Sequence, residues 1–505
     1  MTHATPVDHH DDQHTHGHGR RQLLGGLLGV LALAATVLLA PPEGLSPEGW
    51  RTAGAGMLMA IFWITEPIPI PVTALLPLVL FPALGLGDIR ATAAPYANPI
   101  IYLFLGGFII ALAMERWQLH RRIAIGLVRR LGTRPKAIIA GFLLSSGLTS
   151  MWVSNTATTL MMLPIAMSVA HLVPTTGGRL SRESSDFRTA LLLSIAYGAT
   201  SGGMATLIGT PPNALLAAYM SEVYQITIGF GEWMLVGVPV ALVALAAVYL
   251  VLTRVMFTLG TTPLPGLEAL IEEQRDRLGP VSWGEFASGA VFLLTAGCWV
   301  AQPLIARVVP LVSDTTIAIA GALLLFMIPV NLKRGEFVMT WDATKGLPWG
   351  VLLLFGGGLS LAGNIEAHGL ATWLGSLARE LNHLPTMAVL SIVAFGILLL
   401  TELTSNTATA ATFLPIAGAL ALSLGENPML FLVPTALAAN CSYMLPVGTP
   451  PNAIVYGGGV LPLLAMVRAG FLLNVLLVPI VVGLLVLLGP WVFDIHMGVI
   501  PAWVK

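Results

Sequence analysis

Two identical tripeptides are the residues of this chain best suited to bind a ligand. They are Ser154-Asn155-Thr156 and Ser405-Asn406-Thr407, each with two hydroxyls and one carboxamide and no charge. Each lies in the middle of an apolar segment, where it predicts a break between two half-helices. The half-helix after the break presents free N–H groups and the positive end of its dipole, which favour a carboxylate. Side-chain oxygens and the carbonyls before the break can bind a hard cation such as Na⁺.

A second pair of identical motifs follows the tripeptides. Gly209–Ala214 and Gly448–Ala453 both read GTPPNA, and consecutive prolines after a glycine force a helix to unwind. Unwinding frees carbonyl groups. We therefore assign Thr210 and Thr449 to contact with a substrate or an ion, whereas Asn213 and Asn452 fit either a structural or a binding role.

The duplication favours a binding site over simple capping of broken helices. One Ser-Asn-Thr would be explained by the need to satisfy backbone groups where a helix breaks in a membrane. Here Leu103–Leu119 matches Leu354–Leu370 at the same 251-residue offset that separates the two tripeptides, and the GTPPNA motifs recur at an offset of 239. Three ordered matches indicate an internal repeat.

Composition places the whole chain in a membrane. The 505 residues are 56% hydrophobic and only 10% charged, with a mean hydropathy of +0.83, against about 25% charged residues in soluble domains. The net charge of −1 excludes an extended basic surface for nucleic acid. Paired carboxylates, HExxH and GxSxG are absent, so we expect no enzyme.

Apolar runs predict an all-α polytopic protein with about eleven transmembrane helices and two re-entrant hairpins. The expected spans are 22–40, 53–66, 68–86, 98–115, 188–222 with a break, 231–257, 283–302, 313–330, 347–363, 429–466 with a break, and 468–493. The hairpins are 137–173 and 385–424.

Charge predicts that the two repeats are inverted. The segment 116–136 has seven Lys/Arg, whereas its counterpart 367–387 has only Arg379. By the positive-inside rule the first hairpin opens from the cytoplasm and the second from outside. Arg20 and Arg21 hold the N-terminus in the cytoplasm. Inverted repeats place a substrate site near the bilayer midplane.

These patterns divide the chain into segments of distinct expected structure. They are a disordered His-rich cytoplasmic tail (1–21), a first transmembrane helix (22–48), repeat 1 (49–258), a cytoplasmic connection (259–282), repeat 2 (283–493) and an external C-terminal tail (494–505).

The paired SNT tips, the paired GTPPN loops and Trp63–Pro82 (WITEPIPIPVTALLPLVLFP) together resemble the divalent-anion/sodium symporter family, which includes sodium-coupled dicarboxylate, citrate and sulfate cotransporters. The resemblance extends from about Gly49 onward. It implies an inner-membrane homodimer in which each protomer has a scaffold domain and an elevator-type transport domain.

The resemblance also implies site residues. One Na⁺ site would involve Ser150, Ser154, Asn155 and Gly209, and the other Thr401, Ser405, Asn406 and Gly448. The substrate carboxylates would meet both tips and Thr449. With Thr210 from the first GTPPN loop and Pro450 beside Thr449, these complete the expected substrate-binding residues. Position 448 is Gly, where we expect Ala in many relatives.

The substrate class follows from the two tips. Two neutral tips, each suited to one carboxylate, match a dianion such as succinate, fumarate or malate, or citrate. Neither the tips nor the GTPPN loops contain Lys or Arg, and a buried unpaired charge is costly, so cations must enter with the anion. Sodium-coupled symport is the expectation. A sodium-independent dicarboxylate exchanger and a sodium-coupled sulfate transporter of the same fold remain alternatives.

Two acidic residues lie within the apolar segments near these motifs. Glu402 lies four residues before Asn406, and Glu66 follows Trp63. A carboxylate in a membrane span is a functional candidate, so a proton-coupling role for Glu402 is one hypothesis and a hydrogen-bonded structural role is the other.

Overall fold

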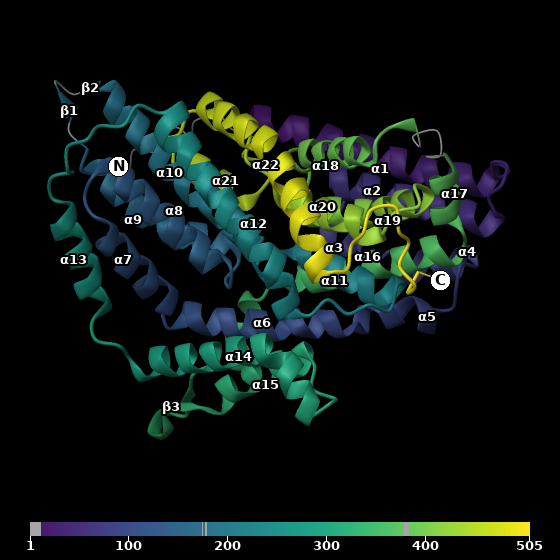
Figure 1. The fold of residues 1–505 in the computed structure, drawn as a ribbon, viewed down its shortest axis with the longest axis horizontal. Helices are drawn as coiled ribbons and strands as arrows, with labels where there is room; N and C mark the ends of the chain where they lie inside the picture. The colour runs from purple at the N-terminus through teal and green to yellow at the C-terminus, as the bar shows by residue number, and fades with distance from the viewer. Residues whose placement is uncertain (1–11, 174, 177–178, 378–382, 505) are drawn as a thin grey trace, which may run out of the picture.

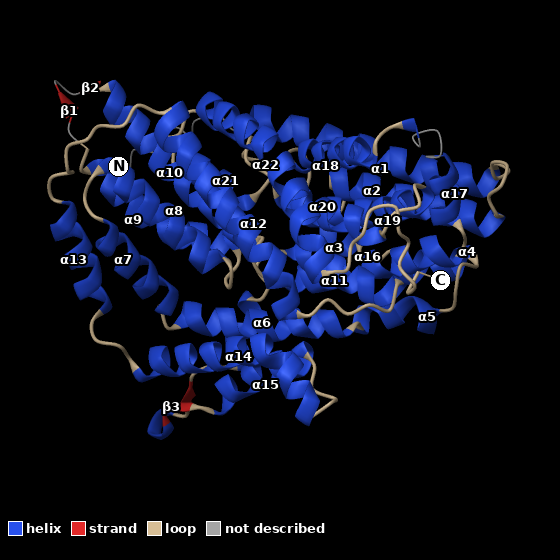
Figure 2. Ribbon diagram, viewed as in Figure 1, coloured by secondary structure: helices blue, strands red, loops and turns tan. Residues whose placement is uncertain are grey.

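The computed structural model describes residues 12–173, 175–176, 179–377 and 383–504, and most of them are helical (Figures 1 and 2). The described strands form two small antiparallel hairpins, β1 (Thr175–Thr176) with β2 (Arg179–Leu180), and β3 (Pro329–Asn331) with β4 (Glu336–Phe337). The expectation of a helical protein is confirmed.

The first half of the chain begins with helices interrupted by prolines and ends with long helices. Its elements are α1 (Asp12–Leu38), α2 (Pro47–Thr65), α3 (Ile70–Thr73), α4 (Pro77–Leu84), α5 (Ile89–Ala93), η1 (Ala94–Ala97), α6 (Pro99–Arg116), α7 (Leu119–Leu131), α8 (Pro135–Ser150), α9 (Asn155–His171), α10 (Arg182–Gly203), α11 (Pro211–Val223), α12 (Phe230–Leu250) and η2 (Val251–Met256).

The second half follows a short connecting helix. Its elements are α13 (Leu267–Leu278), α14 (Trp283–Val308), α15 (Asp314–Met327), η3 (Leu332–Arg334), η4 (Trp341–Gly346), α16 (Trp349–Ala367), α17 (Leu370–Leu377), α18 (Thr386–Thr401), α19 (Asn406–Ser423), α20 (Pro428–Asn440), α21 (Pro450–Gly457) and α22 (Leu463–Val492).

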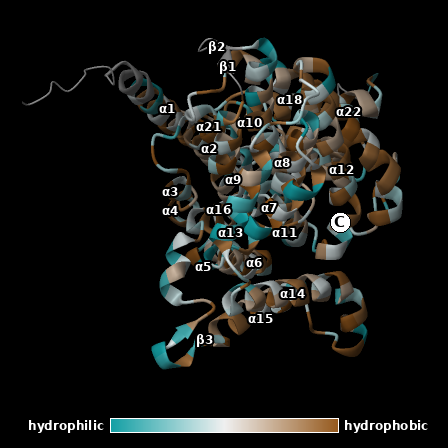
Figure 3. Ribbon diagram, turned by 90° about the vertical axis from the view of Figure 1, so that its left-hand side faces the viewer, coloured by the Kyte–Doolittle hydropathy of each residue, from teal (hydrophilic) through white to brown (hydrophobic). Residues whose placement is uncertain are grey.

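Six helical stretches of the described chain are long and apolar enough to cross a membrane: Gly19–Leu38, Ile89–Arg116, Phe230–Met256, Trp283–Val308, Trp349–Ala367 and Leu463–Val492. Several other apolar helices are shorter because broken or unwound segments divide them. Large apolar side chains such as Leu27, Leu293 and Leu487 are exposed on α1, α14 and α22. Much of the ribbon in Figure 3 has the brown colour of hydrophobic residues, as expected of a protein embedded in lipid.

Two of the expected segments differ from the observed helices. The span expected at 68–86 is instead divided into α3 and α4, because Pro69, Pro71, Pro77 and Pro82 remove the N–H donors that a continuous helix needs. Helix α1 begins at Asp12 rather than near residue 22, since no proline separates residues 12–21 from the apolar run. Residues 1–11 of the expected disordered tail lie outside the described residues.

The two halves break their helices at corresponding positions. Helices α8 and α9 meet at Ser154, and α18 and α19 meet at Ser405. Both bounds of α18 lie 251 residues after those of α8. After each hairpin a long helix ends, the chain unwinds, and α11 or α21 begins at the first proline of GTPPN.

Small residues allow the first hairpin to approach its neighbour closely. Where α8 crosses α10, a Cβ built on Gly202 would lie 2.0 Å from the carbonyl oxygen of Gly147. Close backbone contact of this kind is typical of helices packed within membranes. On the other side of the molecule, α14 and α15 lie against α6 and share a separate apolar core with it (Figure 1).

Candidate functional site

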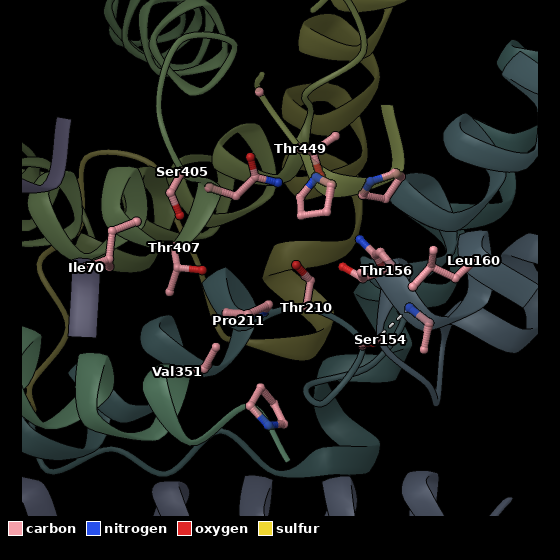
Figure 4. Close-up of a pocket in the computed structure, with 18 of the residues that line it drawn as sticks. Ile70, Ser154, Thr156, Leu160, Thr210, Pro211, Val351, Ser405, Thr407 and Thr449 are labelled. Carbon is pink, nitrogen blue, oxygen red and sulfur yellow. Dashed lines mark hydrogen bonds between the residues drawn. The ribbon is translucent and has the colours of Figure 1, made fainter. Parts of the chain in front are cut away.

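Both Ser-Asn-Thr tips and both GTPPN loops line one cavity of about 770 Å³. In Figure 4, Ser405 and Thr407 lie on one side of this cavity and Ser154 and Thr156 on the other, with Thr210 and Thr449 between them. The site residues expected from the sequence that line it are Ser154, Asn155, Thr156, Gly209, Thr210, Ser405, Asn406, Thr407, Gly448, Thr449 and Pro450. Residues about 250 positions apart in the chain thus share one chamber.

Each tip begins a helix whose N-terminus faces the cavity. Ser154 has extended backbone and caps α9, its hydroxyl accepting from the N–H of Ala157 at 3.2 Å. Ser405 occupies the same position before α19, but its hydroxyl makes no capping bond. The second tip therefore has a serine hydroxyl that a ligand can engage without breaking a helix cap.

Ser150 and Thr401 do not line the cavity but lie directly behind the tips. Both are fully buried. The Ser150 hydroxyl donates to Asn155 Oδ1 at 2.5 Å, and the Thr401 hydroxyl lies 2.8 Å from Asn406 Oδ1 and 2.6 Å from the carbonyl of Ala439. Each tip thus has a compact group of neutral oxygens, which is the ligand type that hard cations prefer.

The two GTPPN loops adopt nearly the same backbone conformation. Thr210 has φ −149° and ψ 144°, and Thr449 has φ −153° and ψ 144°, each just before two prolines that begin a helix. The Thr210 hydroxyl donates to Asn440 Oδ1 at 2.7 Å. Within the described part of the chain no hydrogen bond engages the Thr449 hydroxyl. Of the two threonines, Thr449 is the one whose hydroxyl is available to a ligand.

Asn213 and Asn452 hold the unwound segments together. Asn213 Nδ2 contacts the carbonyls of Gly203, Met204 and Thr206 at 3.2, 3.3 and 2.9 Å. Asn452 Nδ2 lies 3.3 Å from the carbonyl of Ser442 and 3.1 Å from that of Leu445. Both side chains are fully buried, and these hydrogen bonds give each of them a structural role, while their Oδ1 atoms make no hydrogen bond within the described residues.

The electrostatics of the cavity suit an anion accompanied by a hard cation. The N-termini of α9, α11, α19 and α21 all reach it, and each contributes free N–H groups and a positive dipole end. Among the described residues no group of three or more His, Cys, Asp or Glu could hold a metal. Any cation bound at the tips must therefore be held by neutral oxygens, which fits Na⁺ and does not fit a tightly bound transition metal.

Charged residues from outside the two motifs also line the cavity. Arg21, Glu66 and Glu115 are exposed there, together with Gln22, and the Arg21 guanidinium donates to the carbonyl of Ile64. Sequence reasoning treated Arg21 only as a topological anchor and did not place it or Gln22 near the site. Nothing in their spacing indicates that α1 packs beside the cavity, because that contact depends on the tertiary fold.

Glu402 is buried behind the second tip and does not line the cavity. Its carboxylate accepts hydrogen bonds from backbone N–H groups of the unwound segment that follows α20. These contacts match the hydrogen-bonded structural role, which was one of the two hypotheses for Glu402.

Comparison with known proteins supports the family resemblance. A family model described as "Sodium:sulfate symporter transmembrane region" matches residues 21–495. The chain belongs to this family. It is 40% identical over 482 residues to a protein of Staphylococcus saprophyticus named sodium-dependent dicarboxylate transporter SdcS, which covers 94% of this chain and 93% of the relative. A protein of the same name from Staphylococcus aureus is 39% identical over 483 residues, with the same coverage.

Solved structures support the fold. The YdaH transporter of Alcanivorax borkumensis superposes with a TM-score of 0.54 at 14% identity, covering 95% of this chain and 98% of the other. MtrF of Neisseria gonorrhoeae gives a TM-score of 0.53 at 11% identity, covering 94% and 96%. The chain thus has the helical fold of a membrane transporter family, over nearly its full length.

Proposed function

We propose that this protein is a sodium-coupled symporter of C4-dicarboxylates such as succinate, fumarate and malate, or of citrate. The observation that supports the proposal most strongly is the convergence of two matching Ser-Asn-Thr tips on one cavity. The names of the staphylococcal relatives support the same substrate class and the same coupling ion.

The two tips suit a substrate with two separated carboxylates. Each offers a helix N-terminus, hydroxyls and a carboxamide, and the tips lie on opposite sides of the cavity (Figure 4). One carboxylate per tip uses both sets of donors. Sulfate is compact and would engage the donors of one tip only. We therefore favour dicarboxylates as substrates, although the description of the family names sulfate.

Sodium supplies the charge that the site lacks. The tips and GTPPN loops contain no cationic side chain, and a dianion held there without compensation would be costly. Two Na⁺ ions, one in the oxygen group behind each tip, neutralise it. The first site uses Ser150, Ser154, Asn155 and Gly209, and the second uses Thr401, Ser405, Asn406 and Gly448.

In this proposal the halves are inverted repeats and the cavity opens to the cytoplasm. Among the residues that line it, Glu66, Glu115 and Gly346 lie at or near helix ends and Arg21 lies within α1, and the positive-inside rule assigns these positions to the cytoplasmic side. The same rule predicts a cytoplasmic N-terminus, and the family resemblance together with a retained first helix indicates the inner membrane.

The mechanism we propose is alternating access of the elevator type. The hairpins α8–α9 and α18–α19, with the unwound segments, form the mobile transport domain. The remaining long helices form a scaffold through which two protomers associate as a homodimer. This arrangement rests on the family resemblance and on the broken helices.

Uptake of labelled succinate into proteoliposomes tests the function. An inward Na⁺ gradient is compared with an inward K⁺ gradient at matched pH, with and without succinate inside, and empty liposomes as background. We expect accumulation with Na⁺ alone, inhibited by fumarate and malate but not by sulfate. Uptake that is equal with either cation and needs internal dicarboxylate would instead identify an exchanger, and inhibition by sulfate alone would identify a sulfate transporter.

A further inference from the structure

Glu402 is a buried carboxylate for which the transport scheme above has no use. It follows Thr401 at the C-terminal end of α18 and is 3% exposed. Within the described residues it forms no ion pair with Lys, Arg or His. Burying a charge at this position is costly, so the groups that surround the carboxylate must compensate for its desolvation.

Every hydrogen-bond partner of this carboxylate is a donor. The backbone N–H groups of Tyr443, Met444 and Leu445 lie 2.7 to 3.0 Å from its two oxygens. Asn474 Nδ2 lies at 2.8 Å and the Ser442 hydroxyl at 3.3 Å. The three backbone N–H groups among these donors turn the positive ends of their dipoles toward the carboxylate and would repel a metal cation. Five donors thus converge on the two oxygens of Glu402, an arrangement that suits a carboxylate anion and leaves no room for the side chain to ligate an ion.

This nest of donors belongs to one repeat only. The residue 251 positions earlier is Met151, and the residue 239 positions before Ser442 is Gly203. Behind the first tip the Thr206 hydroxyl donates to the carbonyl of Met151 at 2.5 Å, with no carboxylate involved. The two tips are alike in sequence and backbone but differ by one buried negative charge.

Glu402 adjoins the oxygen group of the second tip through its backbone, and its carboxylate approaches Gly448 through the Ser442 hydroxyl. Glu402 is bonded to Thr401, whose hydroxyl contacts Asn406 Oδ1. A Cβ built on Gly448 would lie 3.0 Å from the carbonyl oxygen of Glu402. An anion so close to a group of neutral oxygens in a low-dielectric interior raises their affinity for a cation.

We propose that Glu402 is a positioning residue that makes the two sodium sites unequal. It holds the unwound segment 442–445 in place, and its fixed charge makes the site at the second tip bind Na⁺ more tightly than the site at the first tip. This inference rests on the proposed function, since it takes Na⁺ as the ion bound at the tips. It predicts an order of loading in which the second tip fills at the lower Na⁺ concentration.

The test is Na⁺-dependent thermal stabilisation of the purified full-length protein without substrate, with KCl keeping ionic strength constant. For Glu402→Gln we expect the Na⁺ concentration that gives half-maximal stabilisation to rise roughly tenfold or more. Glu402→Asp keeps the charge and should retain a midpoint within about threefold of wild type, even where its melting temperature falls. Met151→Leu is the matched control in the other repeat and should leave the midpoint unchanged.

A purely structural role would lower the melting temperature of Glu402→Gln without moving its Na⁺ midpoint, and that result would overturn the inference. The same proteins are assayed for succinate uptake, where the Na⁺ dependence should shift in parallel while the KM for succinate at saturating Na⁺ stays within about twofold of wild type.

A second measurement remains decisive if Glu402→Gln does not fold. Stabilisation at low Na⁺ should survive Ser150→Ala, which alters the first tip, and should be lost in Thr401→Ala, which alters the second. The opposite pattern, or equal effects of the two substitutions, would refute unequal loading.

If wild type is stabilised equally by Na⁺ and K⁺, the proposed function itself fails. Na⁺-specific stabilisation that is unchanged in Glu402→Gln contradicts only this inference.

Discussion

Gly448 shows how a single side chain sets the geometry of the second tip. A Cβ at this position would lie 2.1 Å from the Ser442 hydroxyl oxygen, which itself reaches toward the Glu402 carboxylate. The alanine that we expected at this position in many relatives cannot be accommodated here unless Ser442 moves. Gly448 and Ser442 therefore form a matched pair.

We predict that Gly448→Ala lowers the free energy of unfolding by about 1–2 kcal/mol through overpacking and reduces succinate uptake. Adding Ser442→Ala removes the clashing oxygen and should restore most of the lost stability and most of the lost succinate uptake. Gly457→Ala, where a Cβ meets nothing within 4 Å, is the control. Thermal denaturation in detergent and proteoliposome uptake measure the two effects, and a double variant no better than Gly448→Ala would contradict the pairing.

Asn213 gives a second prediction at the scale of one residue. Its carboxamide satisfies carbonyls of the unwound segment before α11. Asn213→Ala leaves them buried without a donor, at a cost of about 1–3 kcal/mol. We expect a clear fall in melting temperature. Asn364→Ala, which removes one bond from a half-buried side chain in α16, should have a much smaller effect; equal effects would show that Asn213 does not hold the loop.

At the level of elements, the close crossing of α8 and α10 positions the first hairpin. The obstacle to a side chain at Gly202 is the backbone of Gly147, which cannot rotate away. We predict that Gly202→Ala destabilises the protein by on the order of 3 kcal/mol or more, seen as aggregation in size-exclusion chromatography. Gly363→Ala, with no atom within 4 Å of its Cβ, should behave as wild type. A monodisperse Gly202→Ala protein with an unchanged melting temperature would refute this packing.

The helix breaks were predictable from the sequence because their causes are local. Ser is a preferred residue just before a helix and Pro is favoured in the first helical turn, so the helix starts that follow Ser154, Ser405, Thr210 and Thr449 can be predicted from residue type. The division of 68–86 into short helices was missed because mean hydropathy outweighed its prolines. The contact of Arg21 with the cavity was missed because it depends on how α1 packs against α2, which periodicity does not encode.

For the whole molecule, the orientation in the membrane follows from the distribution of positive charge. Helix α13, which connects the halves, should face the cytoplasm, and residues 494–504 should face outward. In a Cys298→Ala background, a membrane-impermeant maleimide applied to intact cells should label His496→Cys and leave Arg277→Cys unlabelled until the membrane is opened. The native Cys441 is buried and should not react. Labelling of Arg277→Cys in intact cells would invert the topology.

The central claim is that one dicarboxylate bridges the two tips with Na⁺ behind each. A high-resolution structure of the protein in lipid nanodiscs with saturating succinate and Na⁺ tests it most directly. The account predicts density for one succinate that reaches from Ser154–Thr156 to Ser405–Thr407, with an ion beside Asn155 and another beside Asn406. Succinate bound outside this cavity, or held by one tip alone, would contradict it.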